Sequence, residues 1–150
     1  MTDSPLSVIM NIDGGARGNP GPAGCGVVLQ EAQTGDVIHE AGYFIGKATN
    51  NVAEYTALVN GMKTARMLGV RDLVVLSDSQ LLVRQMIGQY RVKNAGLKPL
   101  FEAAKDLEDQ FEGVIYKHVR RELNKQADAL ANQAMNAKKN VEGAVDFERM

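Results

Sequence analysis

Apolar and polar residues alternate along the first part of the chain with the period of a β-strand. In residues 7–13, Val8, Met10 and Ile12 occupy one face and the intervening residues the other. Two further apolar runs fill residues 24–46 and are joined by QTGD, a turn sequence that predicts a hairpin. The pattern therefore predicts three consecutive strands.

The pattern then changes to a helical period. Apolar residues recur every three or four positions over residues 51–68, and Gly69 suits the end of a helix. Residues 71–79 contain a short apolar run typical of a buried parallel strand. The same criteria predict helices at 79–88, 97–111 and 124–136 and a strand at 113–119.

This element order predicts an α/β fold with one five-stranded mixed sheet. A three-stranded antiparallel meander is extended by two parallel strands, and helices cover both faces. We expect one domain over residues 1–138. Residues 139–150 lose the apolar periodicity, so we expect them to form a mobile carboxyl-terminal tail.

Composition narrows the class of protein. The 150 residues are 45% hydrophobic and 23% charged, as in one globular domain. No apolar run reaches the roughly 18 residues of a membrane span, and MTDSPLS lacks the features of a secretory signal, so we expect no membrane association and a cytoplasmic location. The single cysteine, Cys25, has no partner for an internal disulfide, and we expect a buried thiol.

The net charge of −1 argues against a protein that holds nucleic acid by bulk charge alone. A phosphate-bearing partner would have to be held by local groups or through metal ions.

A glycine-rich stretch, NIDGGARGNPGPAG, follows the first strand. Its glycine spacing is not that of a dinucleotide fingerprint, the next element is a strand rather than a helix, and the lysine of a P-loop is missing. Most of these glycines are expected to serve a wide turn between antiparallel strands. Gly18 and Asn19 remain available to offer a backbone N–H and an amide to a ligand.

Four carboxylates occupy similar positions at the ends of predicted elements. Asp13 and Asp78 end the first and fourth strands, and Glu54 and Asp128 lie in the first turns of two helices. Each has a structural alternative: Glu54 with Asn51 could form a capping-box-like start, Asp78 could cap the following helix, and Asp128 could favour a helix amino terminus.

Convergence of the four acids would change this interpretation. If the first and fourth strands are parallel neighbours, Asp13 and Asp78 lie side by side at the topological switch point. Clustered carboxylates repel unless cations compensate them, and hard oxygen ligands select Mg²⁺ or Mn²⁺. Two such ions would stabilise an in-line phosphoryl displacement, so the pattern indicates phosphodiester hydrolysis.

Four segments, NIDGGARGNPGPAG, TNNVAEYTAL, VLSDSQLLV and NKQADALAN, resemble in order and spacing the four motifs of type 1 ribonuclease H. The resemblance covers about residues 8–137. It implies the ribonuclease H fold and endonucleolytic cleavage of the RNA strand of an RNA/DNA hybrid, leaving 5′-phosphate and 3′-hydroxyl ends. It also implies that the metal-binding acids are Asp13, Glu54, Asp78 and Asp128, with two Mg²⁺ or Mn²⁺ ions in the substrate complex.

The resemblance extends to substrate contacts. Asn19 and the loop around Gly18 are similar to the family's contacts to RNA 2′-hydroxyls, which distinguish RNA from DNA. The other matching positions are Gln80 and Asn51, as polar contacts to the hybrid, and Thr49 and Asn50, in a pocket for a phosphate of the DNA strand.

The chain departs from many family members by lacking a histidine just before the last acid. The connection is VRRELNKQAD, where Arg121 or Arg120 is a candidate to take over part of that role. The two histidines, His39 and His118, alternate within predicted strands and are expected to be structural or surface residues.

A second departure lies after the third motif. Some members carry a basic helix and loop there, whereas QYRVKNAGLK holds only Arg91, Lys93 and Lys98. A solvated loop and a reduced substrate clamp both remain open. We expect a hybrid affinity that falls with salt less steeply than in strongly basic members.

Two other functions remain as alternatives to a monomeric, metal-dependent ribonuclease H. One is a catalytically silent nucleic-acid-binding module of the same fold, which would have no need to retain four mutually repelling acids. The other is a nuclease of the same fold that acts on double-stranded RNA or DNA junctions. The candidate hybrid-contacting amides favour hybrids.

Overall fold

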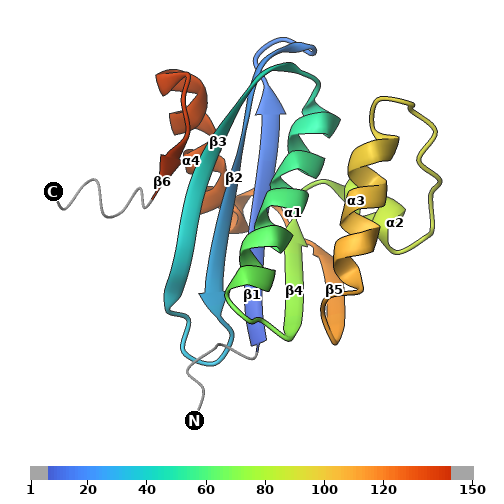
Figure 1. The fold of residues 1–150 in the computed structure, drawn as a ribbon. Helices are drawn as coiled ribbons and strands as arrows, with labels where there is room; N and C mark the ends of the chain where they lie inside the picture. The colour runs from blue at the N-terminus through green and yellow to red at the C-terminus, as the bar shows by residue number, and fades with distance from the viewer. Residues whose placement is uncertain (1–6, 143–150) are drawn as a thin grey trace, which may run out of the picture.

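Within residues 7–142, six strands form one mixed sheet in the order β5-β4-β1-β2-β3-β6 (Figure 1). The computed structural model describes residues 7–142. The strands are β1 (Ser7–Ala16), β2 (Gly21–Glu31), β3 (Val37–Ala48), β4 (Asp72–Ser77), β5 (Gly113–His118) and β6 (Val141–Glu142).

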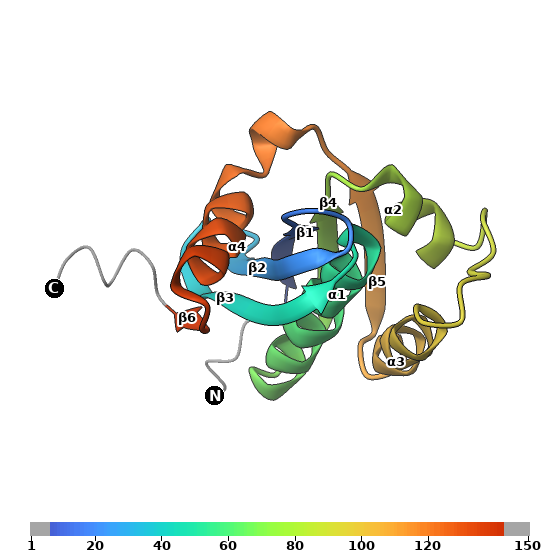
Figure 2. The ribbon, with the colours of Figure 1, turned by 90° about the horizontal axis from the view of Figure 1, so that it is seen from above.

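Helices cover both faces of this sheet. The helices are α1 (Asn50–Met67), α2 (Gln80–Met86), α3 (Lys98–Glu108) and α4 (Lys125–Ala137), with a 3₁₀ turn, η1 (Arg121–Leu123). Seen from above, α1 and α3 pack on one face, α4 covers the other face over β1, β2 and β3, and α2 lies beside β4 and β5 (Figure 2). No helix among residues 7–142 combines the length and apolar character that crossing a membrane requires.

The central strand β1 has the two neighbours that the sequence predicts. It pairs antiparallel with β2 and parallel with β4, and β4 in turn pairs parallel with β5. The predicted α/β class, the antiparallel meander and the two parallel strands are therefore confirmed.

The predicted number of five strands is wrong because β6 adds a sixth. Its two residues pair antiparallel with Ala41 and Gly42 of β3. Two residues are too few to produce a strand period, so the pattern gives no signal for them. Val141 packs against the small apolar cluster beneath α4. This strand lies beyond the expected domain boundary at residue 138, and the mobility expected of residues 143–150 concerns positions outside the described residues.

The main core lies between the sheet and the α1–α3 layer. Val8, Met10 and Ile12 of β1 are fully buried there with Leu58 and Met62 of α1. The alternation that predicted the first strand thus separates a buried face from a face that turns toward α4. Burial of this apolar surface is the main stabilising contribution to such a layered fold.

Glycines on β2 and β3 allow α4 to lie very close to the other face. A Cβ added at Gly26 would clash with the carbonyl oxygen of Ala127, and one at Gly24 would lie 2.9 Å from that of Ala131. Several glycines therefore do more than turn the chain, because they set the distance between the sheet and the helix that carries Asp128.

Candidate active site

Asp13 and Asp78 lie side by side because β1 and β4 run parallel. The last pair in their register joins Ile12 to Ser77, and the two aspartates are the next residues along each chain. Asp13 still pairs with Gly26 of β2, whereas Asp78 leaves the sheet ahead of α2. The two carboxylates meet where β1 has a parallel neighbour on one side and an antiparallel neighbour on the other, which is the predicted switch point.

Glu54 comes to the same place from α1. The helix is capped by Thr49, whose side chain accepts a hydrogen bond from the Val52 amide at 3.2 Å. Glu54 is therefore the fifth helical residue, so the prediction that it lies in the first turn is wrong, as is a capping box that begins at Asn51. The recurrence of apolar residues every three or four positions could locate the buried face of the helix but not its capping residue.

A close contact between α1 and β1 brings Glu54 to Asp13. A Cβ at Gly14 would lie 2.5 Å from the carbonyl carbon of Ala53 and 2.6 Å from the Glu54 nitrogen. Because only glycine fits there, the helix backbone rests directly on the strand. Each of the acids Asp13, Glu54 and Asp78 offers a carboxylate oxygen, and these oxygens lie within 4.8 Å of one another.

Asp128 lies in the first turn of α4, as predicted. The start of this helix is fixed to β1 by Asn124, which is 1% exposed. The Asn124 Nδ2 donates to the Ile12 carbonyl at 2.7 Å, and its Oδ1 accepts from the Asn11 Nδ2 at 2.9 Å. Asp128 is not one of the three clustered ligands, but its carboxyl group is near enough to raise the pKa of Asp13.

The four acids border one open cleft of about 420 Å³. Its other walls come from β1, the start of α1, η1 and α4. The non-acidic residues that line it are Gly14, Gly15, Ala16, Arg17, Asn50, Arg121, Ala131, Asn132 and Met135.

The acids disfavour one another's ionisation. Burial raises the pKa of Asp13 to about 8, and the charge of Asp78, the hydrogen bond and charge of Asp128 and the charge of Glu54 add to the effect. Burial also raises the pKa of Glu54 to about 7, where Asp78 raises it further and a hydrogen bond with Ser79 opposes the shift. Clustered carboxylate oxygens with this unfavourable charge fit a hard divalent cation.

Cys25 lies on β2 opposite Gly14 and is fully buried, as predicted. Burial and the nearby Asp13 raise the pKa of its thiol to about 12. The group stays protonated near neutral pH, so it supplies no thiolate nucleophile to the cleft.

The loop between β1 and β2 is tied to the start of α1. The Asn50 amide nitrogen donates to the Asn19 Oδ1 at 3.1 Å, and the Asn50 Oδ1 accepts from the Ala16 amide at 2.8 Å. Thr49, Asn50 and Asn19 are all predicted substrate contacts. In this structure the side-chain oxygen of each accepts a hydrogen bond from a backbone amide of the protein itself. The three side chains are held in fixed positions on an exposed rim.

The remaining predicted contacts are also exposed. Gly18, whose φ is 83°, lies in the β1–β2 loop, and Asn51 lies in the first turn of α1. Gln80 begins α2 two residues after Asp78, and Arg121 in η1 lines the cleft itself. The predicted contacts therefore come from four segments: the β1–β2 loop, the start of α1, the start of α2, and η1.

Sequence reasoning missed several polar residues around the acids. Arg17 Nη2 donates to Asn132 Oδ1 at 3.3 Å, and both residues line the cleft. Asn124 could have been noticed as the polar residue just before an amphipathic helix. Its burial and its bond to the Ile12 carbonyl have no signal in the sequence.

Neither histidine lines the cleft. His39 of β3 is half-buried, burial lowers its pKa, and its Nε2 is a buried nitrogen with no hydrogen-bond partner within residues 7–142. His118 is exposed at the last position of β5, in register with Ser77. These positions agree with the expected structural and surface roles.

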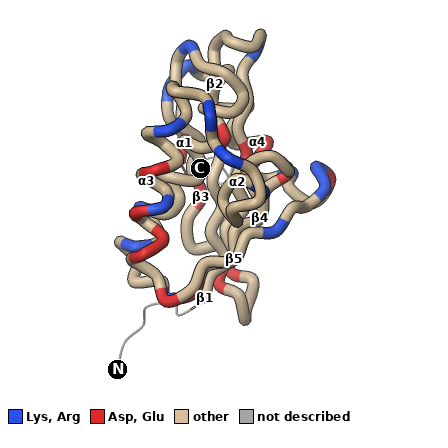
Figure 3. The backbone as a smooth tube through the Cα atoms, turned by 90° about the vertical axis from the view of Figure 1, so that its right-hand side faces the viewer, with Lys and Arg blue, Asp and Glu red and all other residues tan. Residues whose placement is uncertain are grey.

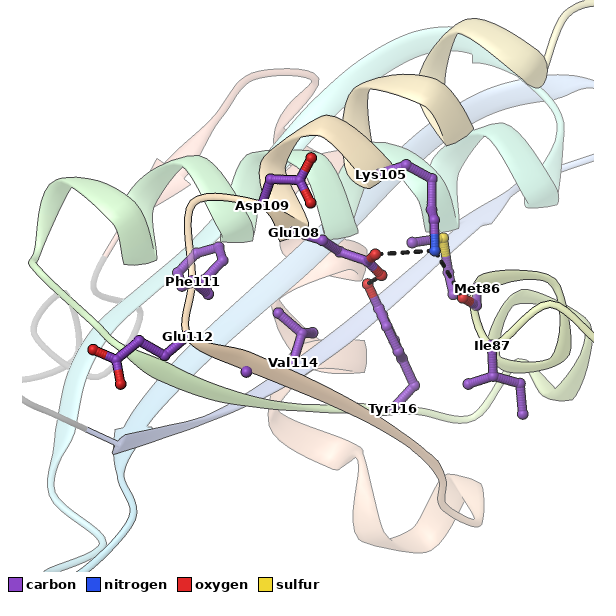
Figure 4. Close-up of a pocket in the computed structure, with 10 residues that line it drawn as sticks. Met86, Ile87, Lys105, Glu108, Asp109, Phe111, Glu112, Val114 and Tyr116 are labelled. Carbon is purple, nitrogen blue, oxygen red and sulfur yellow. Dashed lines mark hydrogen bonds and ion pairs between the residues drawn. The ribbon is translucent and has the colours of Figure 1, made fainter.

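A second cavity, of about 470 Å³, lies between the end of α2, α3 and β5 (Figure 4). The Glu108 carboxylate accepts a hydrogen bond from the Tyr116 hydroxyl at 2.5 Å and forms an ion pair with the Lys105 Nζ at 2.9 Å. Lys105 also donates to the Met86 carbonyl at 3.2 Å. This cavity contains none of the four acids, and its Lys105, Glu108 and Tyr116 side chains are engaged in these contacts.

The chain is similar to a known protein family and to proteins of known structure. The family model described as "Reverse transcriptase-like" matches residues 11–134. The chain is 46% identical over 132 residues to the bifunctional protein Rv2228c of Mycobacterium tuberculosis, covering 88% of this chain and 36% of that protein. The chain thus spans about a third of the length of this relative.

Two solved structures share the fold closely. The N-terminal RNase H domain of Rv2228c, solved as a fusion with maltose-binding protein, superposes with a TM-score of 0.85 at 46% identity, covering 88% of this chain and 95% of that one. LC11-RNase H1, solved in complex with an RNA/DNA hybrid, superposes with a TM-score of 0.83 at 40% identity, covering 87% and 98% of the two chains.

Proposed function

The chain belongs to the type 1 ribonuclease H family, and from this membership we propose that it is an endonuclease that hydrolyses the RNA strand of RNA/DNA hybrids. The products would carry 5′-phosphate and 3′-hydroxyl ends. The observation that carries the proposal is the cluster of three carboxylates within 4.8 Å, in a cleft of about 420 Å³ that a fourth acid also borders.

We propose that Asp13, Glu54, Asp78 and Asp128 hold two Mg²⁺ or Mn²⁺ ions in the substrate complex. The oxygen-only donor set and the raised pKa values of Asp13 and Glu54 support a hard divalent cation. When bound, such ions supply activation of a water and stabilisation of the attacking and leaving oxygens. The role of the protein is to hold the four carboxylates at fixed positions on β1, α1, α4 and the end of β4.

Substrate selection would rest on short polar side chains around the cleft. Asn19, Asn51 and Gln80 are exposed and can offer amides to 2′-hydroxyls across the wide minor groove of a hybrid. Gly18 would allow a close approach of the loop backbone. A deoxyribose strand lacks these hydroxyls, so the same contacts would discriminate against DNA.

Phosphates of the hybrid would meet a few local polar and positive groups. Thr49 and Asn50 lie on the exposed rim, where the proposed pocket for a phosphate of the DNA strand would form, and Arg121 borders the acids. Figure 3 shows Lys and Arg mixed with Asp and Glu on the side that carries α3, with both signs along that helix. This mixture supports binding through a few local contacts rather than a broad basic face.

The proposal places a monomer in the cytoplasm, where the buried Cys25 thiol would remain reduced. The domain that carries the activity is proposed to correspond to residues 1–138, and β6 extends the folded unit to residue 142.

A panel of substrates tests the proposal. Labelled RNA/DNA, RNA/RNA and DNA/DNA duplexes are incubated with the protein in Mg²⁺, Mn²⁺ or EDTA, beside Asp13→Asn and a surface control, Asp36→Asn. We expect metal-dependent cleavage of the RNA strand of the hybrid, retained in the control and lost in Asp13→Asn. Preferred cleavage of RNA/RNA or of DNA would instead support another nuclease of this fold, and hybrid binding without cleavage would support a silent binding module.

A further inference from the structure

A buried hydrogen bond joins the two helices that accompany Glu54 and Asp78. The Tyr55 hydroxyl of α1 donates to the Gln85 Oε1 of α2 at 2.9 Å. Tyr55 is 1% exposed and Gln85 is 6% exposed. Both polar groups are thus shielded from water. Because neither can bond to water instead, loss of this hydrogen bond would be costly.

The two residues are placed close to the acids along the chain. Tyr55 directly follows Glu54, and Gln85 lies in the last turn of the helix that begins just after Asp78 and Ser79. The Tyr55 ring is held in turn by Phe101 of α3, edge to face, with 6.4 Å between ring centroids. This contact fixes the position of the Tyr55 hydroxyl, which can then hold α2 in place through Gln85.

Helix α2 needs such external support because it is short. It has seven residues, less than the length at which a helix is stable on its own. At its carboxyl end, Lys105 of α3 donates to the Met86 carbonyl (Figure 4). The Tyr55–Gln85 bond is a buried polar link from the last turn of α2 to the helix that carries Glu54.

We propose that Tyr55 and Gln85 are positioning residues that fix the spacing between Glu54 and Asp78 and thereby set the affinity of the site for divalent cations. Apolar packing between α1 and α2 would tolerate small shifts of α2, whereas a buried hydrogen bond at 2.9 Å is directional. Shifts of a few tenths of an ångström matter at a metal site because ligand distances are narrowly defined. The inference rests on the proposed metal site and deepens it.

Three variants separate positioning from packing. Tyr55→Phe removes the hydroxyl and leaves the Gln85 amide buried without its partner. Gln85→Met removes the acceptor with a side chain of similar length. The double variant removes both polar groups and leaves an apolar contact, so no buried group is unsatisfied. Mn²⁺ binding is measured without nucleic acid by electron paramagnetic resonance of the free ion, and thermal unfolding is measured in EDTA.

We expect the double variant to regain most of the thermal stability that Tyr55→Phe loses. Its Mn²⁺ affinity should nevertheless remain roughly tenfold below wild type, as for other residues that orient metal ligands. In hybrid cleavage, kcat should fall by a larger factor than KM for the hybrid rises, because Gln80 is the one proposed substrate contact that lies on α2.

Tyr116→Phe is a matched control. It also removes a tyrosine hydroxyl bond, to Glu108, which is partly buried and lies in the cavity that contains none of the four acids. We expect it to lower thermal stability and leave Mn²⁺ affinity unchanged.

Recovery of wild-type Mn²⁺ affinity together with stability in the double variant would overturn the inference, and so would an equal loss of affinity in Tyr116→Phe. A wild-type protein that binds no Mn²⁺ would also overturn it. If the wild type binds Mn²⁺ but cleaves no hybrid, the proposed function fails while the Mn²⁺ affinities of the variants still decide the role of Tyr55 and Gln85.

Discussion

Asp13→Asn is expected to abolish cleavage and to stabilise the metal-free fold. The reason is the raised pKa of Asp13, about 8 against an ordinary value of 3.8. Between these pH values the unfolded chain has lost the proton that the folded protein retains, so the stability of the wild type falls as the pH rises. Asparagine carries no such proton, and the variant escapes this loss.

The size of the effect follows from the same pKa values. A lone carboxyl with this shift would destabilise the folded state by about 4 kcal/mol at pH 7. Asp13 lies beside other carboxylates, and water reaches the open cleft, so we expect a gain of about 1 to 3 kcal/mol for Asp13→Asn at pH 7. Near pH 4 the two proteins should have almost equal stability, and the gap should widen until about pH 8.

Urea unfolding in EDTA at several pH values between 4 and 8 measures this gap. Asp36→Asn is the matched control, since it removes an exposed charge in the β2–β3 turn and should follow the wild-type curve. Addition of Mg²⁺ should stabilise the wild type more than Asp13→Asn. A variant that is less stable than the wild type at pH 7, or a gap that does not depend on pH, would refute the interpretation of Asp13 as one of several repelling ligands.

Three further predictions concern packing and binding. Gly14→Ala should destabilise the fold by about 1 to 3 kcal/mol and lower kcat by moving Glu54. Gly15→Ala should be tolerated, because its Cβ would lie 3.7 Å from its nearest neighbour. An equal loss of stability in urea for the two variants would contradict this contrast. Asn124→Ala should cost about 2 to 3 kcal/mol by leaving the Ile12 carbonyl unpaired, measured by thermal unfolding, and an unchanged Tm would disprove it. Hybrid affinity should fall between 50 and 200 mM salt, and a flat titration would contradict binding through phosphates.

The sequence predicted the fold class and brought two of the acids together for a physical reason. Alternation identified β1, the short apolar run identified β4, and parallel pairing of the two placed Asp13 beside Asp78. The recurrence of apolar residues also located α1, but the start of the helix depends on one hydrogen bond that Thr49 accepts from the Val52 amide, so the turn that holds Glu54 was misplaced.

Other features depend on contacts between segments far apart in the chain. Gly14 and Gly26 matter because helix backbones rest on them, and the sequence shows only that they are glycines. The polar contacts of Asn124 and the link from Tyr55 to Gln85 likewise appear only when the helices are packed. The hydrophobic pattern of one segment does not indicate how a distant segment packs against it.

Cleavage of a hybrid with the RNA strand labelled at one end tests the central claim most directly. The wild-type protein and Asp13→Asn are compared in Mg²⁺ and in EDTA, and the termini of the products are identified. We expect the wild type to cut the RNA strand internally only when the metal is present, to leave 5′-phosphate and 3′-hydroxyl ends, and to spare the DNA strand. Cleavage that continues in EDTA or in Asp13→Asn, or an intact RNA strand in Mg²⁺ and Mn²⁺, would contradict the assignment of the four acids.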